Sequence, residues 1–236
     1  MKALLLAAGL GTRLKPLTDN LPKALVEING KTLLEIQIEK LSQAGFNDII
    51  VNTHHFSQKV IDFLINNNFN ATITISDESS ELLDTGGGLK KAEWFFDDKP
   101  FLVYNVDVLS DLNLNKLINY HNRSSNLATL VVRNRNTMRY FLFNSENILC
   151  GWENKSTGEK IIKRQFDKIT NLAFSGIQII NPSIFKLIKN KGKFSLTDLY
   201  LKLSGTENIG SYIDNDSLWM DMGSIDNLNK ANEFFA

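Results

Sequence analysis

The first eleven residues combine a short apolar run with two closely spaced glycines. Residues 3–8 are all alanine or leucine, and Gly9 and Gly11 follow at once. Such a run suits a buried parallel strand that leads into a loop, and it is shorter than the apolar region of a signal peptide. Glycine lets backbone amides approach an anion closely. We therefore expect the first strand to carry an anion-binding loop to one edge of a sheet.

The chain up to Asp111 alternates between predicted strands and predicted helices. Helical spacing over 32–44 ends at Gly45, and a second helix is expected from Ser57. Strands are expected over 48–53, 71–75 and 101–106. This order is typical of a parallel sheet covered by helices on both faces.

The chain after Asp111 is richer in strands. Strands are predicted over 127–133, 140–143, 148–152 and 171–180. Pro182 is expected to occupy the first position of a short helix, and Ser195 to cap another, with Asp198 completing an approximate capping box. The sequence thus predicts an α/β first half (1–111) joined without a linker to a β-rich second half (112–236).

Charge and cysteine content narrow the possible partners and the compartment. The 236 residues include 26 basic and 26 acidic side chains, so the net charge is zero. Bulk nucleic-acid binding usually needs a basic surplus, and no apolar run approaches the ~18 residues of a membrane span. The single Cys150 cannot form an internal disulfide. We expect a cytoplasmic protein with neither nucleic acid nor membrane as its partner.

Two familiar phosphate-loop motifs fail in the N-terminal segment. The dinucleotide fingerprint needs a small residue at position 14, which is Leu14, and the P-loop needs glycine at position 25, which is Leu25. What remains is a glycine loop with Arg13, followed by Lys23 ten residues later. The bidentate Arg13 and the mobile charge of Lys23 suit a triphosphate. By spacing alone, a tight turn with two solvated cations fits equally well.

A longer match decides between these interpretations. The segment LAAGLGTRLKPLT at 6–18, followed by LPKAL at 21–25, resembles the signature of the sugar-1-phosphate nucleotidyltransferases, also called NDP-sugar pyrophosphorylases. The resemblance implies a Rossmann-like, mixed but mostly parallel sheet flanked by helices, with a sugar-binding half at 112–236. It implies catalytic roles for Arg13 and Lys23. The implied nucleotide contacts are Ala7, Ala8, Gly9, Gly11, Thr12, Arg13, Lys23, Thr85, Gly86, Gly87 and Asn105.

Two acids are expected to hold a magnesium ion. Asp107 follows an apolar strand at the sheet edge where ligands bind, and a cation would have to separate it from a triphosphate. A turn-capping role is the alternative. The segment around Asp221, Trp-Met-Asp-Met-Gly-Ser, resembles the family's late Trp-x-Asp-x-Gly-Thr segment, whose aspartate completes the metal site. Ser224 stands where that segment has threonine, and a helix N-terminal cap is the alternative for Asp221.

A second glycine run, at 83–89, is predicted to be a loop that reads the base. Its glycines would let main-chain amides and carbonyls contact a flat ring, and a flexible hairpin is the alternative. An acid followed by Thr-Gly-Gly-Gly resembles the uridylyltransferases that act on N-acetylmuramic acid 1-phosphate, with Asp84 in place of their usual glutamate. On the sugar side, the resemblance implies contacts from Gly176, Glu153 and Lys155.

The resemblance implies a magnesium-dependent enzyme acting on a nucleoside triphosphate and a sugar 1-phosphate, as a monomer or homodimer. UTP and N-acetylmuramic acid 1-phosphate are the preferred substrates. The rivals are guanylyl transfer to mannose 1-phosphate, cytidylyl transfer to a non-sugar alcohol phosphate, and a regulatory subunit that has lost catalysis. Larger family members append an acetylating β-helix. With 236 residues, we expect a single activity here and an acceptor that arrives already modified.

Overall fold

Strand β1 (Lys2–Leu6) lies inside the sheet of the computed structural model, which describes residues 1–234. It pairs in parallel with β4 (Asp48–Thr53) on one side and with β6 (Phe101–Asn105) on the other. Side chains alternate across a strand, so Ala3 and Leu5 enter one apolar cluster while Leu4 and Leu6 enter the other. Both faces are covered, which is why this strand is apolar without interruption.

Within residues 1–234, ten strands form one mixed sheet. Besides β1, β4 and β6 it contains β5 (Thr72–Asp77), β8 (Ala128–Arg133), β9 (Arg139–Phe143), β10 (Leu149–Asn154), β11 (Glu159–Ile162), β12 (Thr170–Ile180) and β13 (Ile209–Ile213). The part β6-β1-β4-β5 is parallel, and β9, β10 and β11 are antiparallel.

Strand β12 joins the parallel and antiparallel parts. Its first residues, 170–172, pair with β9, and its last residues, 177–180, pair with β6. Between them the register with β8 shifts, and Gly176 has a φ of +77°. A positive φ favours glycine, so this residue allows the strand to bend between its two sets of partners.

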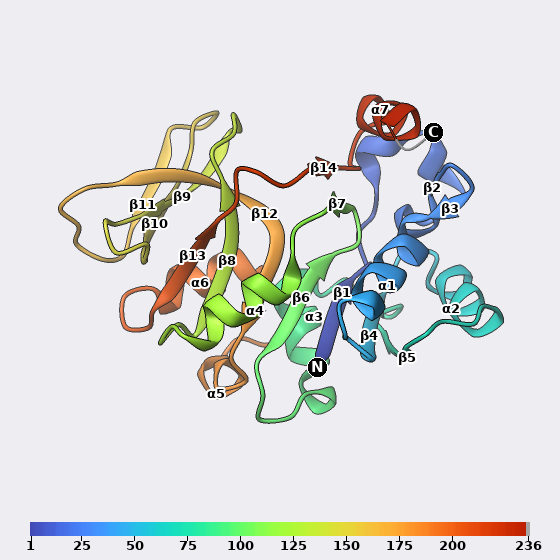
Figure 1. Cartoon of the computed structure of the whole chain (residues 1–236), viewed down its shortest axis with the longest axis horizontal. Helices are drawn as coiled ribbons and strands as arrows, with labels where there is room; N and C mark the ends of the chain where they lie inside the picture. The colour runs from blue at the N-terminus through green and yellow to red at the C-terminus, as the bar shows by residue number, and fades with distance from the viewer. Residues whose placement is uncertain (235–236) are drawn as a thin grey trace.

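Helices cover the sheet on both faces (Figure 1). Apolar side chains of α1 (Leu33–Gln43), α2 (Ser57–Asn66), α4 (Leu114–Asn122) and α7 (Ile225–Phe234) join the cluster that contains Leu5. Those of α3 (Asp84–Lys91), α5 (Ile184–Leu187) and α6 (Leu196–Leu203) join the cluster that contains Leu4. None of these helices has both the length and the apolar character needed to cross a membrane, within the residues described.

Two short hairpins complete the fold. One joins β2 (Glu27–Ile28) to β3 (Lys31–Thr32). The other pairs β7 (Val108–Ser110), which directly follows β6, with β14 (Trp219–Asp221) near the end of the chain. In Figure 1 the red C-terminal segment returns through β14 to the green β7. This pairing brings residues close to position 221 beside residues close to position 107.

The predicted mixed sheet with flanking helices is confirmed, and two local predictions are wrong. The helix expected over 32–44 is α1, capped by the Thr32 hydroxyl, which accepts from the Glu35 amide. The helix expected from Ser57 begins there. The segment 83–89 is not a loop, since helix α3 starts at Asp84. Pro182 is not in the first helical position either, because α5 begins at Ile184 after a turn.

Candidate active site

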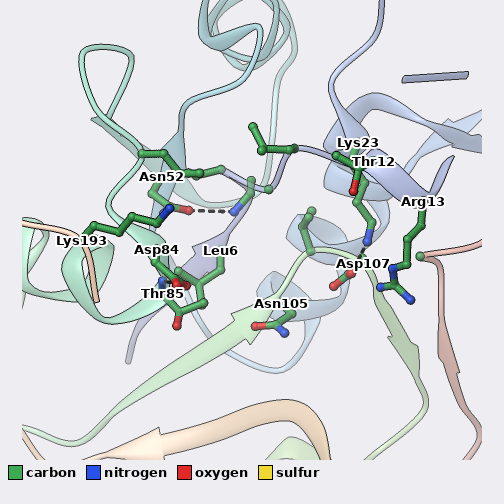
Figure 2. A pocket seen from close by; sticks show the side chains of 18 residues that line it. Leu6, Thr12, Arg13, Lys23, Asn52, Asp84, Thr85, Asn105, Asp107 and Lys193 are labelled. Atoms are coloured by element: carbon green, nitrogen blue, oxygen red, sulfur yellow. Dashed lines mark hydrogen bonds and ion pairs between the residues drawn. The ribbon is translucent and has the colours of Figure 1, made fainter. Parts of the chain in front are cut away.

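A cavity of about 400 Å³ opens at the carboxyl ends of β1, β4 and β6. Its lining residues are Leu6, Ala7, Ala8, Gly9, Leu10, Gly11, Thr12, Arg13, Lys23, Asn52, Leu82, Asp84, Thr85, Asn105, Val106, Asp107, Lys193 and Gly223. Figure 2 shows two ends to this cavity. Thr12, Arg13, Lys23 and Asp107 form what we call the glycine-loop end, and Asn52, Asp84, Thr85 and Lys193 form the α3 end. The volume and the position at this sheet edge suit a small ligand.

The glycine loop folds back on itself so that Lys23 reaches Gly11. Gly11 has a φ of +66°, and a Cβ atom there would lie 2.9 Å from the Thr18 methyl and 3.1 Å from the Lys23 Cβ. The buried Thr18 hydroxyl donates to the Gly11 carbonyl at 2.8 Å. Both the positive φ and the close packing require glycine at this position. The conformation of the loop is therefore stabilised by packing and by a buried hydrogen bond.

Lys23 and Asp107 form an ion pair at the glycine-loop end. The two side chains are 10% and 22% exposed, and the Lys23 ammonium donates to Asp107 Oδ2. A charge this deeply buried needs a partner. Lys23 is placed by the turn Lys23–Leu25, and Asp107 by its position two residues after β6. The sequence predicted both residues for this site, and the structure brings them into contact.

Arg13 and Asp221 form a second, more open pair beside the first. Arg13 Nη2 lies 3.6 Å from Asp221 Oδ2, and the side chains are 67% and 33% exposed. The β7–β14 register places Asp221 opposite Val108, and the Met222 amide donates to the Asp107 carbonyl at 2.7 Å. The two predicted acids thus lie near each other although they are far apart in sequence, and of the two Asp107 lines the cavity while Asp221 does not.

The carboxylate oxygens of Asp107 and Asp221 are suitable ligands for a magnesium ion. No cluster of three His, Cys, Asp or Glu side chains that could hold a metal occurs within residues 1–234. Mg²⁺ commonly takes one or two carboxylates and completes its shell with water and substrate phosphates. Asp107 and Asp221 match that requirement in number and chemistry. Their role as metal ligands remains a prediction.

A buried hydrogen-bonded chain holds the start of the glycine loop. The Ala7 amide donates to Asn52 Oδ1 at 2.7 Å, and Asn52 Nδ2 donates to Glu78 Oε1 at 2.8 Å. Burial raises the pKa of the Glu78 carboxyl above its usual value, although the hydrogen bond from Asn52 acts in the opposite direction. These two hydrogen bonds fix the orientation of the Asn52 amide. Asn52 therefore joins the end of β4 to the loop that leaves β1.

The glycines of 86–88 allow close packing within the protein. A Cβ atom at position 86 would lie 2.5 Å from two ring carbons of Phe194, and one at position 88 would lie 2.7 Å from Glu78 Oε1. The amides of Gly86 and Gly87 both donate to the Phe194 carbonyl, at 2.9 and 3.1 Å. These two amides are already bonded, so neither is free to read a base in this arrangement. Nucleotide contact by Gly86 and Gly87 stays a prediction, and neither residue lines the cavity.

The other predicted nucleotide contacts do line the cavity. Ala7, Ala8, Gly9, Thr12, Thr85 and Asn105 all do so. The Thr85 hydroxyl accepts from the Leu196 amide at 2.9 Å, which ties the α3 end to helix α6. Direct contact of these residues with a nucleotide remains a prediction.

The predicted sugar residues are divided in space. Gly176 lies beside Asn105, since a Cβ atom there would be 3.0 Å from Asn105 Nδ2. Glu153 and Lys155 do not line the cavity. Glu153 Oε1 accepts from Asn171 Nδ2 at 2.6 Å, and the Lys155 ammonium lies 4.7 Å from the centre of the Tyr140 ring. Their contact with a sugar remains a prediction, and both are engaged with protein groups here.

Sequence reasoning missed three lining residues at the α3 end, namely Asn52, Leu82 and Lys193. Asn52 could have been found, because it lies near the carboxyl end of a parallel strand, as Asp107 does. Leu82 and Lys193 carried no signal. Lys193 precedes helix α6, and only the tertiary packing brings it to the cavity.

The sequence matches a protein-family model and several curated proteins. A family model described as "Nucleotidyl transferase" matches residues 2–236. The mannose-1-phosphate guanyltransferase of Yarrowia lipolytica is 32% identical over 227 residues, covering 94% of this chain and 61% of the relative. The UTP–glucose-1-phosphate uridylyltransferase of Synechocystis is 30% identical over 242 residues, covering 95% of this chain and 61% of the relative. The chain thus spans about three fifths of the length of these curated relatives.

A solved structure matches over nearly the whole of both chains. HddC from Yersinia pseudotuberculosis, in complex with GMP-PN, superposes with a TM-score of 0.81 at 25% identity. The match covers 100% of this chain and 99% of HddC. The fold described above is therefore similar to that of HddC, whose crystal structure was determined in complex with GMP-PN.

Proposed function

This chain belongs to the nucleotidyl transferase family, and on that basis we propose that it transfers a nucleoside monophosphate from a nucleoside triphosphate to a sugar 1-phosphate. The products are an NDP-sugar and pyrophosphate. The observation that carries the proposal is the glycine-loop end of the cavity, where Lys23 and Arg13 lie beside Asp107 and Asp221. Two cations can bind phosphates there, and two acids can hold the metal that accompanies them.

The proposed step is an in-line displacement at the α-phosphorus. An oxygen of the sugar 1-phosphate attacks the α-phosphorus, the bond to the bridging oxygen of the β-phosphate breaks, and pyrophosphate leaves with that electron pair. The attacking phosphate is already ionised, so no protein base has to remove a proton. The chain contributes position and charge, with Lys23 and Arg13 exchanging their carboxylate partners for phosphate oxygens.

Asp107 and Asp221 would hold the magnesium ion. When bound there, the ion would neutralise charge on the triphosphate and on the leaving pyrophosphate. Asp107 is released for this role when Lys23 turns to the phosphates. The protein also supplies the glycine loop, whose conformation is stabilised by the Thr18–Gly11 hydrogen bond and by the close packing around Gly11.

For the base and the acceptor, we propose UTP and N-acetylmuramic acid 1-phosphate. The support is the sequence Asp-Thr-Gly-Gly-Gly at 84–88, which resembles the corresponding segment of uridylyltransferases for that sugar. A second candidate is guanylyl transfer to mannose 1-phosphate. The similarity to the Yarrowia lipolytica mannose-1-phosphate guanyltransferase favours it. The Gly86 and Gly87 amides are bonded to the Phe194 carbonyl, which weakens the case for recognition of uracil by these amides.

A substrate panel tests the proposal. UTP, GTP, CTP and ATP would each be offered with N-acetylmuramic acid 1-phosphate, mannose 1-phosphate or phosphocholine, and pyrophosphate release would be measured. We expect the highest kcat/KM for UTP with N-acetylmuramic acid 1-phosphate. Preferential formation of GDP-mannose would replace the uridylyl assignment with the second candidate. Release confined to CTP with phosphocholine would indicate cytidylyl transfer to an alcohol phosphate, and absence of release with all acceptors would contradict the proposed activity.

A further inference from the structure

A third cation reaches the cavity from the side opposite to Arg13 and Lys23. Lys193 lines the α3 end together with Asp84 and Thr85. Figure 2 shows Lys193 and Asn52 on one side of the cavity and Lys23 and Arg13 on the other. Lys193 comes from the β-rich half of the chain, just before α6, and the glycine loop comes from the first half.

The backbone that follows Lys193 is hydrogen-bonded to the start of α3. The Phe194 amide donates to the Leu83 carbonyl at 3.1 Å, and the Phe194 carbonyl accepts from the amides of Gly86 and Gly87 at 2.9 and 3.1 Å. The Leu196 amide donates to the Thr85 hydroxyl oxygen at 2.9 Å. The side chain is long, but these bonds fix the position from which it extends.

The glycine run makes this attachment possible. A Cβ atom at position 86 would overlap the Phe194 ring, and a Cβ atom at position 87 would overlap the Gly192 carbonyl. Gly192 itself has a φ of +66°. Phe194 and Gly192, on either side of Lys193, therefore pack directly against Gly86 and Gly87. Gly86 and Gly87 thus allow segment 192–196 to pack against the start of α3, beside the cavity.

Lys193 is exposed and forms no ion pair with any carboxylate within residues 1–234, although Asp84 lines the same end. The cations at the glycine-loop end are both paired with acids. Lys193 thus differs from them in having its ammonium available to a ligand.

We propose that Lys193 is a nucleotide-contact residue that donates a hydrogen bond to a carbonyl oxygen of the base. The inference rests on the proposed function. Figure 2 shows the glycine-loop end and the α3 end on opposite sides of the cavity. If the triphosphate occupies the glycine-loop end, a base that extends across the cavity would meet Lys193 at the α3 end. A lysine ammonium only donates, so it selects an acceptor, and uracil and guanine both present a carbonyl oxygen on their pairing edge.

Equilibrium titrations separate base contact from phosphate contact. Wild type, Lys193→Met and Lys193→Arg would be titrated with UTP, UMP, GTP, GMP and pyrophosphate, with Mg²⁺ present throughout. We expect Lys193→Met to lower the binding affinities for the preferred triphosphate and for its monophosphate by the same factor, roughly tenfold for one charge-assisted hydrogen bond. Pyrophosphate binding should not change, and Lys193→Arg should retain most of the affinity.

Lys186→Met is the matched control, because Lys186 is an exposed lysine on α5 that does not line the cavity. It removes the same charge and should leave every affinity unchanged. Equal losses for pyrophosphate and nucleotides in Lys193→Met would mean that Lys193 contacts phosphate, and would overturn the inference. Unchanged nucleotide binding in Lys193→Met would overturn it as well. Failure of the wild-type protein to bind any of the nucleotides would overturn the proposed function together with it.

Discussion

At the scale of single residues, Lys23 and Asp107 depend on each other. Their pair is far less exposed than the one between Arg13 and Asp221. Removing one partner of a buried pair leaves the other charge without compensation, which can destabilise the fold. Replacements at these positions should therefore keep the shape of the side chain, and folding should be verified before activity is interpreted.

Asp107→Asn removes the carboxylate charge with little change in shape. We expect turnover to fall at least ~100-fold, because a metal ligand that stabilises the transition state is lost. The measurement is kcat as a function of Mg²⁺ concentration, with thermal unfolding to verify the fold. Near wild-type turnover at limiting Mg²⁺ would rule out Asp107 as the metal ligand.

Lys23→Met keeps the aliphatic stem and removes the charge. We expect kcat to fall by a larger factor than KM for the triphosphate rises, because negative charge on the phosphates increases in the transition state. Lys15→Met is the control, since Lys15 is an exposed lysine that pairs with Asp19 and does not line the cavity. A Lys23→Met protein whose sole defect is a raised KM would assign Lys23 to uniform substrate binding.

At the scale of elements, helix α3 begins where local preference argues against a helix. Glycine is a poor helix former, and three consecutive glycines favour a loop in isolation. Here they lie between Phe194 and Gly192 on one side and the Asn52–Glu78 pair on the other. Phe194 and Gly192 are more than a hundred positions away from these glycines, and Asn52 lies on another strand, so no local pattern in the sequence contains the contacts.

Gly86→Ala tests this packing. The added methyl would meet the Phe194 ring and carbonyl, so we expect the free energy of unfolding to fall by about 1–3 kcal/mol. Urea unfolding of both proteins measures this difference in the free energy of unfolding. Gly205→Ala is the control, because its methyl would lie 3.5 Å from the Lys163 carbonyl oxygen, which is an ordinary van der Waals contact. An unchanged stability of Gly86→Ala would contradict the packing role of the glycine run.

The contact between α4 and β8 makes stability depend on pH through His121. This side chain is 3% exposed, its Nδ1 lies 2.8 Å from the Thr129 hydroxyl, and burial lowers its pKa to about 4. The unfolded chain binds a proton near its ordinary pKa of ~6.5, so this contribution is complete above that pH and is lost as pH falls toward 4.

Replacing His121 by glutamine should therefore flatten the acid side of the stability profile. Between pH 7 and pH 5, we expect the wild type to lose roughly 1–2 kcal/mol more than His121→Gln, following the difference between the two pKa values. Urea unfolding at both pH values measures this difference. Equal losses in the two proteins would show that His121 is not responsible for it.

At the scale of the whole molecule, the site is assembled from segments far apart in the chain. The glycine loop follows β1, Asp107 follows β6, Asp221 ends β14, and Lys193 precedes α6. The β7–β14 pairing and the attachment of segment 192–196 to α3 close the arrangement. Loss of the β7–β14 pairing would separate Asp221 from Asp107.

How much the sequence could predict follows from this assembly. Strand β1, helix α1 and the start of α2 were predictable, because apolar spacing and a Thr32 cap are local signals. Asp107 was predictable as an acid at a strand end. The β7–β14 pairing, the helical start of α3 and the place of Lys193 were not, since each depends on contacts between distant segments.

Transfer at the α-phosphorus is tested most directly by following the two ends of the triphosphate separately. UTP labelled at the α-phosphate and UTP labelled at the γ-phosphate would be incubated with the enzyme and N-acetylmuramic acid 1-phosphate, with GTP and mannose 1-phosphate as the parallel pair. We expect the α-label to enter the NDP-sugar and the γ-label to enter pyrophosphate in equal amounts, and only when the acceptor is present. Release of the γ-label as inorganic phosphate, or of the α-label as free nucleoside monophosphate, would contradict nucleotidyl transfer.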